Sequence, residues 1–323
     1  MKFLVRRFLH SVFLLMGVSL LSFSLLQLTP GSFFDEMQLN PQISRATVSR
    51  LRAEYGMDRP MLQRYVCWLE SAARGDWGLS FAYNAPVAPL IWARARNTLL
   101  LTGLALPLAW IIALPIGVLS AGERYRWIDR GGNLVASVLL VTPELLLALG
   151  LLWLALRTRW FPAGGMASVV PIKHGAAAHI KDLVQHLFAP VTVLVLGSLP
   201  VLLRHIRSAM VDALQTPYIK AARSHGIPYL RILFRHALPA ASSPLLSLAG
   251  LSLASLLSVS LLVEVIMNWP GLGPLLLEAI LARDVYVVVG AVMLSGLFLV
   301  CATAVSDVLL FIADPRIRTE DLA

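Results

Sequence analysis

Charged residues are scarce in this 323-residue chain: Asp, Glu, Lys and Arg make up 14% of it, whereas 58% of its residues are hydrophobic. A soluble globular domain of ordinary composition has about 25% charged residues, so this chain is too apolar to be one. The few charges lie mainly between long apolar runs rather than within them. The composition therefore indicates a polytopic membrane protein.

Cysteine is almost absent as well. Cys67 lies in a polar segment and Cys301 lies inside the last apolar run, so no disulfide framework is predicted. A zinc site would also need more closely clustered ligands than the chain offers. One group of candidate ligands was considered, and it consists of His174, His179, His186 and Asp182. Their spacing does not assign all of them to one helical face, and Asp182 is the sole carboxylate among them, so we predict a surface loop there and no metal site.

Several functional signatures are missing. The chain has no Gly-x4-Gly-Lys-Ser/Thr phosphate loop, so we expect it neither to bind nor to hydrolyse ATP. No candidate nucleophile has a recognisable local context, so no catalytic residue is assigned. The alternating aromatic and basic residues that stack on single-stranded nucleic acid are also missing. The net charge of +9 is explained by Lys and Arg beside membrane spans, where they attract anionic lipid.

Long apolar runs predict six membrane-spanning helices. The first run begins near Phe8 and is ~20 residues long, and no small-x-small cleavage site follows it, so it is a retained span and not a signal peptide. The third run is interrupted at Pro143-Glu144. The other predicted spans are 97–120, 187–203, 240–263 and 285–312, with the third at 133–156. The predicted fold is an all-α polytopic membrane protein.

Three segments are predicted: residues 1–28 with the first span, a polar insert at 29–96, and a core membrane region at 97–323 with the remaining spans. Within the insert, one helix is predicted from Asn40-Pro41 to Tyr55, and a second begins after Asp58 and Pro60. The apolar face of the second helix consists of Met61, Tyr65, Trp68 and Leu69, and the segment Gly75-Asp76-Trp77-Gly78 forms a turn. Because the insert has few apolar residues, we expect it to pack on the spans.

Lys and Arg are distributed unequally about the predicted spans. The N-terminus, the 121–132 loop, the 204–240 segment and the C-terminal tail have fourteen of them, whereas the two short loops on the other side have five. The 29–96 insert is left out of this comparison, because long segments cross the membrane largely regardless of charge. The positive-inside rule therefore predicts that both termini face the cytoplasm and that the insert lies outside.

A polar stretch from Gln215 to Pro228 separates two apolar runs and has the punctuation of a short helix. Thr216 can accept an amide hydrogen bond as an N-cap, and Pro217 suits the first helical position. Gly226 can adopt the left-handed conformation just past the helix end, and the proline after it prevents continuation. A stiff helix of about two to three turns is predicted.

A second amphipathic piece follows, from Tyr229 to Leu238. Arg231 and Arg235 lie one turn apart on one of its faces. Its apolar face consists of Leu230, Leu233, Phe234 and Ala237. A basic loop lying on the membrane surface would have the same pattern, and the residues alone leave that alternative open.

The spacing within this region resembles the cytoplasmic loop signature of ABC importer permeases. That signature reads Glu-Ala-Ala, three residues, Gly, nine residues, Ile-x-Leu-Pro. Here Ala221-Ala222 is followed after three residues by Gly226 and, after nine more, by His236-Ala237-Leu238-Pro239. Two positions depart from it, since Lys220 replaces the common Glu and His236 replaces the common Ile.

Other segments resemble the dipeptide, oligopeptide and nickel permeases of that group, in matching order along nearly the whole chain. They are Thr29-Pro30-Gly31, Tyr55-Gly56-Met57-Asp58-Arg59-Pro60, Gly75-Asp76-Trp77-Gly78-Leu79-Ser80, Trp269-Pro270-Gly271-Leu272-Gly273 and Asp314-Pro315-Arg316-Ile317-Arg318. The resemblance implies a subunit of the bacterial inner membrane that works with a second permease, two ATP-binding subunits and an external binding protein. ATP and Mg²⁺ would be bound by those partners, and this chain would bind no cofactor.

The resemblance also implies that the predicted short helix, Tyr218 to Gly226, is a coupling helix seated in a groove of the ATPase. A rigid helix between two spans can act as a lever, because a push on it tilts the spans that it joins. The residues assigned to coupling are Thr216, Pro217, Tyr218, Lys220, Ala221, Ala222, Arg223 and Gly226. Lys220 and Arg223 would supply polar contacts at its rim.

The candidates for the translocation pathway are few. Glu144 lies inside a span, where a charge is expensive, so its side chain should face protein or water. It could meet a peptide ammonium, or it could be neutral and hydrogen-bonded to a neighbouring span. Ser252, Ser255 and Ser258 recur every third residue and so lie on one slowly rotating stripe. That stripe lines the pathway or forms a helix contact.

The function predicted from the sequence is a permease subunit of an ATP-driven importer of dipeptides or oligopeptides. Nickel or oligosaccharide cargo is the alternative within the same family. A secondary carrier would need buried ionisable relays and often an internal repeat, and neither is clear in this chain. An intramembrane enzyme would need a catalytic constellation, which is missing.

Overall fold

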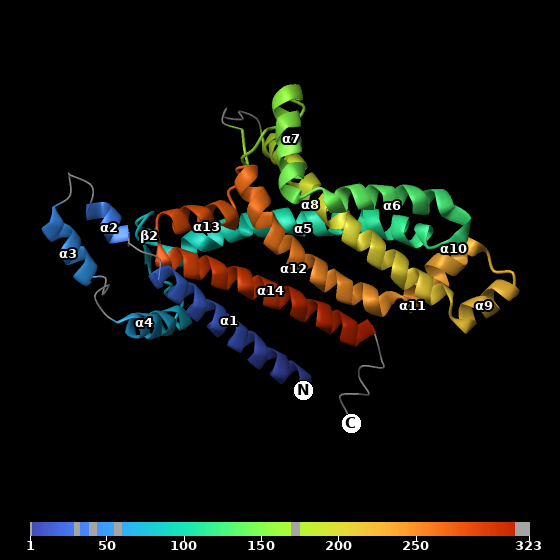
Figure 1. The fold of residues 1–323 in the computed structure, drawn as a ribbon, viewed down its shortest axis with the longest axis horizontal. Coiled ribbons are helices and arrows are strands. Elements are labelled where there is room, and N and C mark those ends of the chain that lie inside the picture. Colours follow the sequence, from blue (N-terminus) through green and yellow to red (C-terminus); the bar gives the residue numbers. More distant parts are fainter. Residues whose placement is uncertain (1, 29–32, 39–43, 55–59, 169–174, 314–323) are drawn as a thin grey trace. The chain divides into compact units, whose positions relative to one another are not determined.

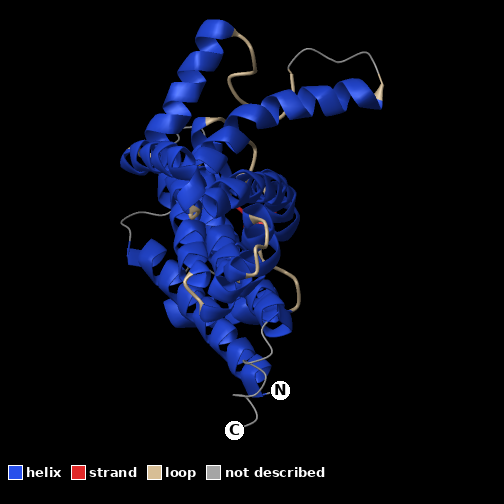
Figure 2. Cartoon of the chain, turned by 90° about the vertical axis from the view of Figure 1, so that its right-hand side faces the viewer, coloured by secondary structure: helices blue, strands red, loops and turns tan. Residues whose placement is uncertain are grey.

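The computed structural model describes residues 2–28, 33–38, 44–54, 60–168 and 175–313. Several sequence predictions lie outside these residues. They are the helix start at Asn40-Pro41, the cap at Asp58, the ligand candidate His174, and the family segments at 29–31, 55–59 and 314–318. The described chain is almost entirely helical (Figures 1 and 2). It forms two compact units, residues 1–97 with 270–298 and residues 98–269 with 299–323.

Within the described residues, five helices are long and apolar enough to cross a bilayer, and a bent pair makes a sixth if it is counted as one span. The five are α1 (Lys2–Leu28), α5 (Val87–Ser120), α8 (Ala176–Leu214), α12 (Ser242–Ile266) and α14 (Val285–Ala313). The pair consists of α6 (Arg126–Val141) and α7 (Glu144–Thr158). The predicted all-α polytopic membrane fold is confirmed.

The break in the third span is also confirmed. Between Val141 and Glu144 the chain bends by 96°, so that α7 turns away from α6 (Figure 1). Pro143 has φ −58° and ψ 144°, which is extended backbone, and its carbonyl accepts the first amides of α7. Because proline has no amide hydrogen and disfavours a helical residue before it, the break occurs where the sequence contains one.

Two span lengths were predicted wrongly. The helix α5 begins at Val87 rather than at residue 97, and α8 covers 39 residues although only 187–203 was predicted. Residues 176–185, predicted as loop, are therefore helical. Hydropathy identifies only the apolar middle of a span. The helix itself continues into the polar flanks, because backbone hydrogen bonds form there too when no residue terminates it.

The first unit contains the described parts of the insert. Its elements are α1, α2 (Phe33–Gln38), α3 (Arg45–Glu54), α4 (Met61–Ala73), the two-residue strands β1 (Leu79–Ser80) and β2 (Ala85–Pro86), the start of α5, α13 (Leu272–Leu281) and the start of α14. The predicted packing of the insert on a span is confirmed by α4. The Tyr65 hydroxyl lies 2.8 Å from the Ser19 hydroxyl of α1, and its ring meets Phe23 edge to face at 5.7 Å.

The turn predicted at Gly75-Asp76-Trp77-Gly78 is present. Gly75 and Gly78 have φ of +89° and +90°, and the Gly78 amide donates to the Asp76 carboxylate at 3.0 Å. The next residues reach the start of α14, where the buried Asp284 carboxylate accepts from the Ser80 hydroxyl at 2.7 Å. The helix α13 was not predicted, because an apolar helix of ten residues is too short to be recognised as a span.

The second unit is built around α8, which packs against α6, α7 and α12 (Figure 1). Small residues allow close approach in this unit. A Cβ atom added at Gly250 of α12 would lie 2.2 Å from the Ser306 Cβ of α14, and one at Gly117 of α5 would lie 2.6 Å from Ile206 of α8. The remaining elements of this unit are η1 (Glu123–Tyr125), α9 (Pro217–Ser224), α10 (Tyr229–Arg231), the π-helical η2 (Ile232–Ala237) and α11 (Leu238–Ala240).

Candidate functional site

The predicted short helix is α9, and it begins and ends where its punctuation indicates. Pro217 occupies the first helical turn, and Gly226 has φ +72° just past the end. The N-cap hydrogen bond predicted for the Thr216 side chain is wrong. The Thr216 hydroxyl instead donates back to the Ala213 carbonyl of α8 at 2.7 Å, and the same carbonyl accepts the Thr216 amide at 3.2 Å.

One face of α9 is anchored and the other is open. Ile219 is fully buried, and Ala222 is half-buried. The exposed residues are Pro217, Tyr218, Lys220, Ala221, Arg223 and Ser224. Ile219 therefore anchors α9, and the opposite, largely polar face of this short helix is exposed.

The piece after α9 is helical, as predicted, but its apolar face differs. The elements α10, η2 and α11 follow one another with a π-helical turn in the middle. Leu233 and Ala237 are fully buried, whereas Leu230 and Phe234 are 50% and 42% exposed. The wider π-helical turn rotates the residues that the 3.6-residue period would place together. Ile232, which that period left out, is buried instead.

Tyr229 connects this region to the loop between α5 and α6. The Arg223 guanidinium lies 5.6 Å from its ring centroid, and the ring of Tyr125 lies 6.4 Å away. A Cβ atom at Gly122 would lie 2.6 Å from the Tyr229 hydroxyl oxygen, so the loop approaches closely. Burial raises the pKa of the Tyr229 hydroxyl above its ordinary value. Sequence reasoning did not single out Tyr229, since its partners Gly122 and Tyr125 are about a hundred residues away.

Two further contacts join neighbouring elements here. The Tyr218 hydroxyl of α9 donates to the His236 carbonyl of η2. The Arg207 guanidinium of α8 donates to both carboxylate oxygens of Asp129 in α6, at 2.5 and 2.9 Å. Such a bidentate pair fixes orientation as well as distance. The exposed helix α9 is therefore connected to α8, to η2 and, through Tyr229, to the loop before α6.

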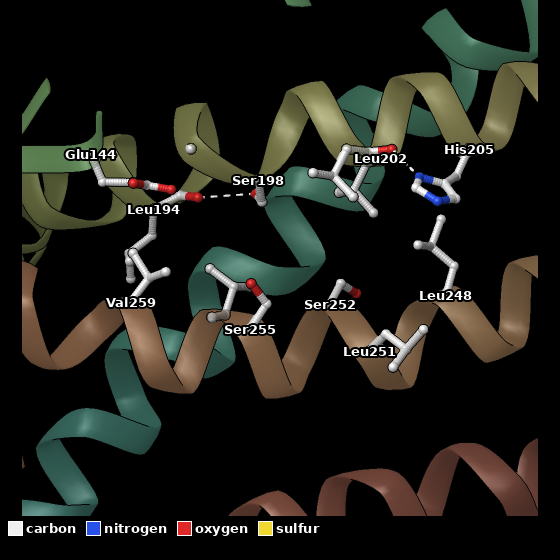
Figure 3. A pocket seen from close by; sticks show the side chains of 13 residues that line it. Glu144, Leu194, Ser198, Leu202, His205, Leu248, Leu251, Ser252, Ser255 and Val259 are labelled. Carbon is white, nitrogen blue, oxygen red and sulfur yellow. Dashed lines mark hydrogen bonds between the residues drawn. The ribbon is translucent and has the colours of Figure 1, made fainter. Parts of the chain in front are cut away.

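A cavity of about 260 Å³ lies between α7, α8 and α12 (Figure 3). Three of the predicted pathway residues, Glu144, Ser252 and Ser255, line it. Ser258 does not, and its hydroxyl donates to the Ala254 carbonyl on an exposed face. Sequence reasoning missed Ser198 and His205, which α8 contributes. They lie seven residues apart and so share a helical face, which was the available signal.

The polar groups of the cavity have defined partners. The Ser198 hydroxyl donates to the Leu194 and Val195 carbonyls, both at 2.9 Å. The Ser252 hydroxyl donates to the Ala249 carbonyl at 2.8 Å and accepts from the indole of Trp110 at 3.2 Å. His205 Nδ1 lies 2.8 Å from the Val201 carbonyl.

Gly197 leaves room for the Glu144 side chain. A Cβ atom at Gly197 would lie 3.0 Å from the Glu144 Cγ. Glu144 also belongs to the first turn of α7, where a negative charge is favoured by the helix dipole. Within the described part of the chain, no group donates a hydrogen bond to its carboxylate.

The histidine group examined for metal is arranged differently. The Asp182 carboxylate accepts from the Ser168 amide at 2.9 Å and from the Ser168 hydroxyl. His186 is buried with its Nδ1 2.8 Å from the Asp182 carbonyl, and His179 is exposed. Among the residues that the structure describes, no three such groups gather to hold a metal ion. That this chain binds no metal stays a prediction.

Comparison with known proteins places the chain. Residues 113–319 match the family described as binding-protein-dependent transport system inner membrane component, and residues 1–102 match its N-terminal region. The oligopeptide transport system permease protein AppB of Bacillus subtilis is 35% identical over 318 residues, 98% of this chain and 99% of AppB. The oligopeptide transport system permease protein OppB of Mycobacterium bovis is 30% identical over 323 residues, with 98% and 99% covered.

Among solved structures, the inward-facing methionine ABC transporter MetNI is similar, with a TM-score of 0.56 and 17% identity over 70% of this chain and 96% of that one. That likeness concerns the fold alone. The family matches and the full-length relatives confirm the resemblance read from the motifs. The chain belongs to the binding-protein-dependent transport system inner membrane components, the permease subunits of ABC importers, in the branch that contains the peptide permeases.

Proposed function

We propose that this chain forms half of the translocation pathway of an ATP-driven importer of short peptides. The names of the similar proteins support peptide cargo, since AppB and OppB are both oligopeptide permeases. The geometry of α9 supports the ATP-driven mechanism, because a short, exposed, rigid helix lies in the connection between two membrane-length helices, α8 and α12. That observation carries the proposal.

The contacts of α9 suggest how a push on it would spread. The Thr216 hydroxyl connects its start to the end of α8, and Tyr218 connects it to η2, which leads into α12. Tyr229 connects it to the loop before α6. A displacement of α9 would therefore move three neighbouring elements together, as in rigid-body transitions. ATP binding would close the ATPases, move α9 and open the pathway outward, and hydrolysis would reset it.

The coupling roles of Thr216, Pro217, Tyr218, Lys220, Ala221, Ala222, Arg223 and Gly226 belong to this proposal. So do the partners: a second permease, two ATP-binding subunits that hold ATP and Mg²⁺, and an external binding protein. The exposed Lys220 and Arg223 would contact the rim of the ATPase groove. Both termini and α9 would face the cytoplasm of a bacterial inner membrane, according to the excess of basic residues on that side.

Co-purification tests the proposal. An affinity-tagged full-length chain, expressed with the other genes of its operon, should bring two ATP-binding subunits and a second permease with it. The purified complex in liposomes should accumulate a tripeptide only when ATP and the binding protein are supplied. A chain that purifies without ATPases would favour a secondary carrier. ATP-dependent uptake of nickel or oligosaccharide in place of peptide would contradict peptide cargo and support the alternative within the family.

A further inference from the structure

The polar groups that line the cavity between α7, α8 and α12 share one property: most of them can accept hydrogen bonds but have no hydrogen left to donate. The hydroxyl hydrogens of Ser198 and Ser252 are engaged by backbone carbonyls. Their remaining lone pairs are acceptors. Glu144, when ionised, is an acceptor with a full negative charge.

His205 extends this pattern to the far end of the cavity (Figure 3). Its Nδ1 faces the Val201 carbonyl at 2.8 Å, and a carbonyl can only accept, so Nδ1 bears the hydrogen. In the neutral ring, Nε2 is then an acceptor. No Lys or Arg is among the residues that line the cavity. A ligand with carboxylate or phosphate oxygens would find little there to bind.

From this arrangement we infer that the cavity is a binding site for a primary ammonium group of the transported peptide, with Glu144 as its counter-charge. An ammonium has three N–H donors and a positive charge, which complements a carboxylate surrounded by acceptors. The inference rests on the proposed peptide-import function and adds to it a site that prefers a positively charged group.

The size and placement of the cavity fit one end of a peptide rather than a whole one. Its volume of about 260 Å³ is slightly below that of sites for drug-sized ligands, about 300–1,000 Å³. Glu144 belongs to the helix that begins after the 96° bend, and its side chain points toward α8 (Figure 3), where it lies beside Gly197. A charge at membrane depth is retained where it faces protein or water and binds a partner.

Cysteine modification tests the charge preference without any cargo. In the reconstituted transporter with Cys67 and Cys301 replaced by serine, Ser255→Cys places a thiol on the cavity wall. We expect cationic aminoethyl methanethiosulfonate to react with it about tenfold or more faster than anionic sulfonatoethyl methanethiosulfonate, after correction for a free thiol, since the Glu144 carboxylate in the same cavity attracts the cation and repels the anion. Glu144→Gln should bring the ratio close to one, and Glu144→Asp should keep it high.

The matched control retains Cys67 as the sole cysteine, since this thiol is exposed on α4, and its ratio should not respond to Glu144→Gln. A cavity thiol that shows no preference for the cation with Glu144 present, or that reacts with neither reagent, would overturn the ammonium site. The ratio of the two reaction rates is measured first in the protein that retains Glu144, so the test remains valid even if the Glu144→Gln variant does not assemble.

Uptake measurements distinguish the two sources of an ammonium. Trialanine has only its N-terminal ammonium, and N-acetyl-Ala-Lys-Ala has only the lysine side chain. Selective loss of uptake of the first in Glu144→Gln would assign the site to the peptide N-terminus, and selective loss of the second to lysine side chains. Unchanged uptake of both would overturn the site and leave the importer assignment standing. Glu70→Gln, the same substitution at an exposed position of α4, serves as the control.

Discussion

At the scale of single residues, Gly226 has the most restrictive backbone in the candidate coupling region. Its φ of +72° is a conformation that β-branched residues rarely adopt, and an added Cβ atom would meet nothing within 4 Å. Any effect of a side chain there would therefore come from the backbone and not from a clash. The strain of a non-glycine residue in such a conformation is about 1–3 kcal/mol.

We predict that Gly226→Val disturbs the end of α9 and uncouples transport. Peptide uptake per ATP hydrolysed should fall severalfold in the reconstituted complex, while the amount of chain in the membrane stays the same. The physical reason is that relief of the backbone strain would redirect the chain where α9 passes into α10. Simultaneous measurement of uptake and phosphate release gives the ratio.

Gly226→Asn is the matched control, because asparagine tolerates the left-handed conformation better than other residues with a side chain. It should retain most of the coupling. If the Val variant transports as efficiently as the unmodified protein, the assignment of α9 as the lever is wrong.

The sequence predicted the positions of single residues better than their partners. Thr216 and Pro217 were correctly placed at the start of α9, but the Thr216 hydroxyl donates to α8 instead of capping its own helix. Local chemistry limits which conformations a residue can adopt, whereas its hydrogen-bond partner depends on what else is nearby. Three of the four proposed pathway residues line one cavity, and the fourth, Ser258, lies outside it on an exposed part of α12.

At the scale of elements, two helix boundaries lie where the sequence has a stop signal, although a proline alone does not end a helix, since Pro107 and Pro115 lie inside α5. The break before Glu144 coincides with a proline, and the end of α9 coincides with Gly226, whose φ is positive. Where no such residue exists, as at the polar ends of α8, hydropathy underestimated the helix. Elements that are neither membrane-length nor punctuated, such as α13, were missed.

The start of α14 has a cap that can be tested. The fully buried Asp284 carboxylate accepts from the Val287 amide at 3.4 Å, from the Ser80 hydroxyl at 2.7 Å and from the Ala82 amide at 3.1 Å. We predict that Asp284→Ala leaves these donors unpaired and lowers the free energy of unfolding by about 1–3 kcal/mol. The midpoint of thermal inactivation of the detergent-solubilised protein should fall accordingly.

Asp284→Asn separates the cap from the loop contact. Its amide oxygen can still accept from the amide of Val287 or from Ser80, but its NH₂ group cannot replace the second carboxylate oxygen. An intermediate loss of stability is expected. An Ala variant as stable as the unmodified protein would show that this carboxylate does not hold the 80–82 segment in place.

At the scale of the whole molecule, the cavity illustrates what a sequence does not contain. Its wall combines Glu144 of α7 with serines of α12 and with Ser198 and His205 of α8, so it is drawn from residues more than a hundred positions apart in the sequence. The helical period predicts which residues of one helix share a face, but the angle at which the three helices face one another depends on packing. That acceptors predominate in this lining becomes apparent only when the hydrogen-bond partners of all three helices are known.

The distribution of charge predicts the orientation of the whole chain. Fourteen Lys and Arg lie beside the predicted spans on the side of both termini and α9, against five in the two short loops on the other side, with the long 29–96 insert left out of the comparison. The insert that contains α4 should then lie outside the cell. Exposed cysteines allow this to be measured, because Cys67 lies on α4 and Ser224, at the end of α9, can be replaced.

We predict that a membrane-impermeant maleimide added to right-side-out vesicles labels Cys67 when it is the only cysteine. With Cys67 and Cys301 replaced by serine, Ser224→Cys should be labelled only after the vesicles are permeabilised. Reversal of the two results would place α9 outside, where no ATPase could reach it, and would contradict both the orientation and the coupling mechanism. Labelling of both positions after permeabilisation shows that each thiol is reactive, so protection before it reports the side of the membrane and not burial.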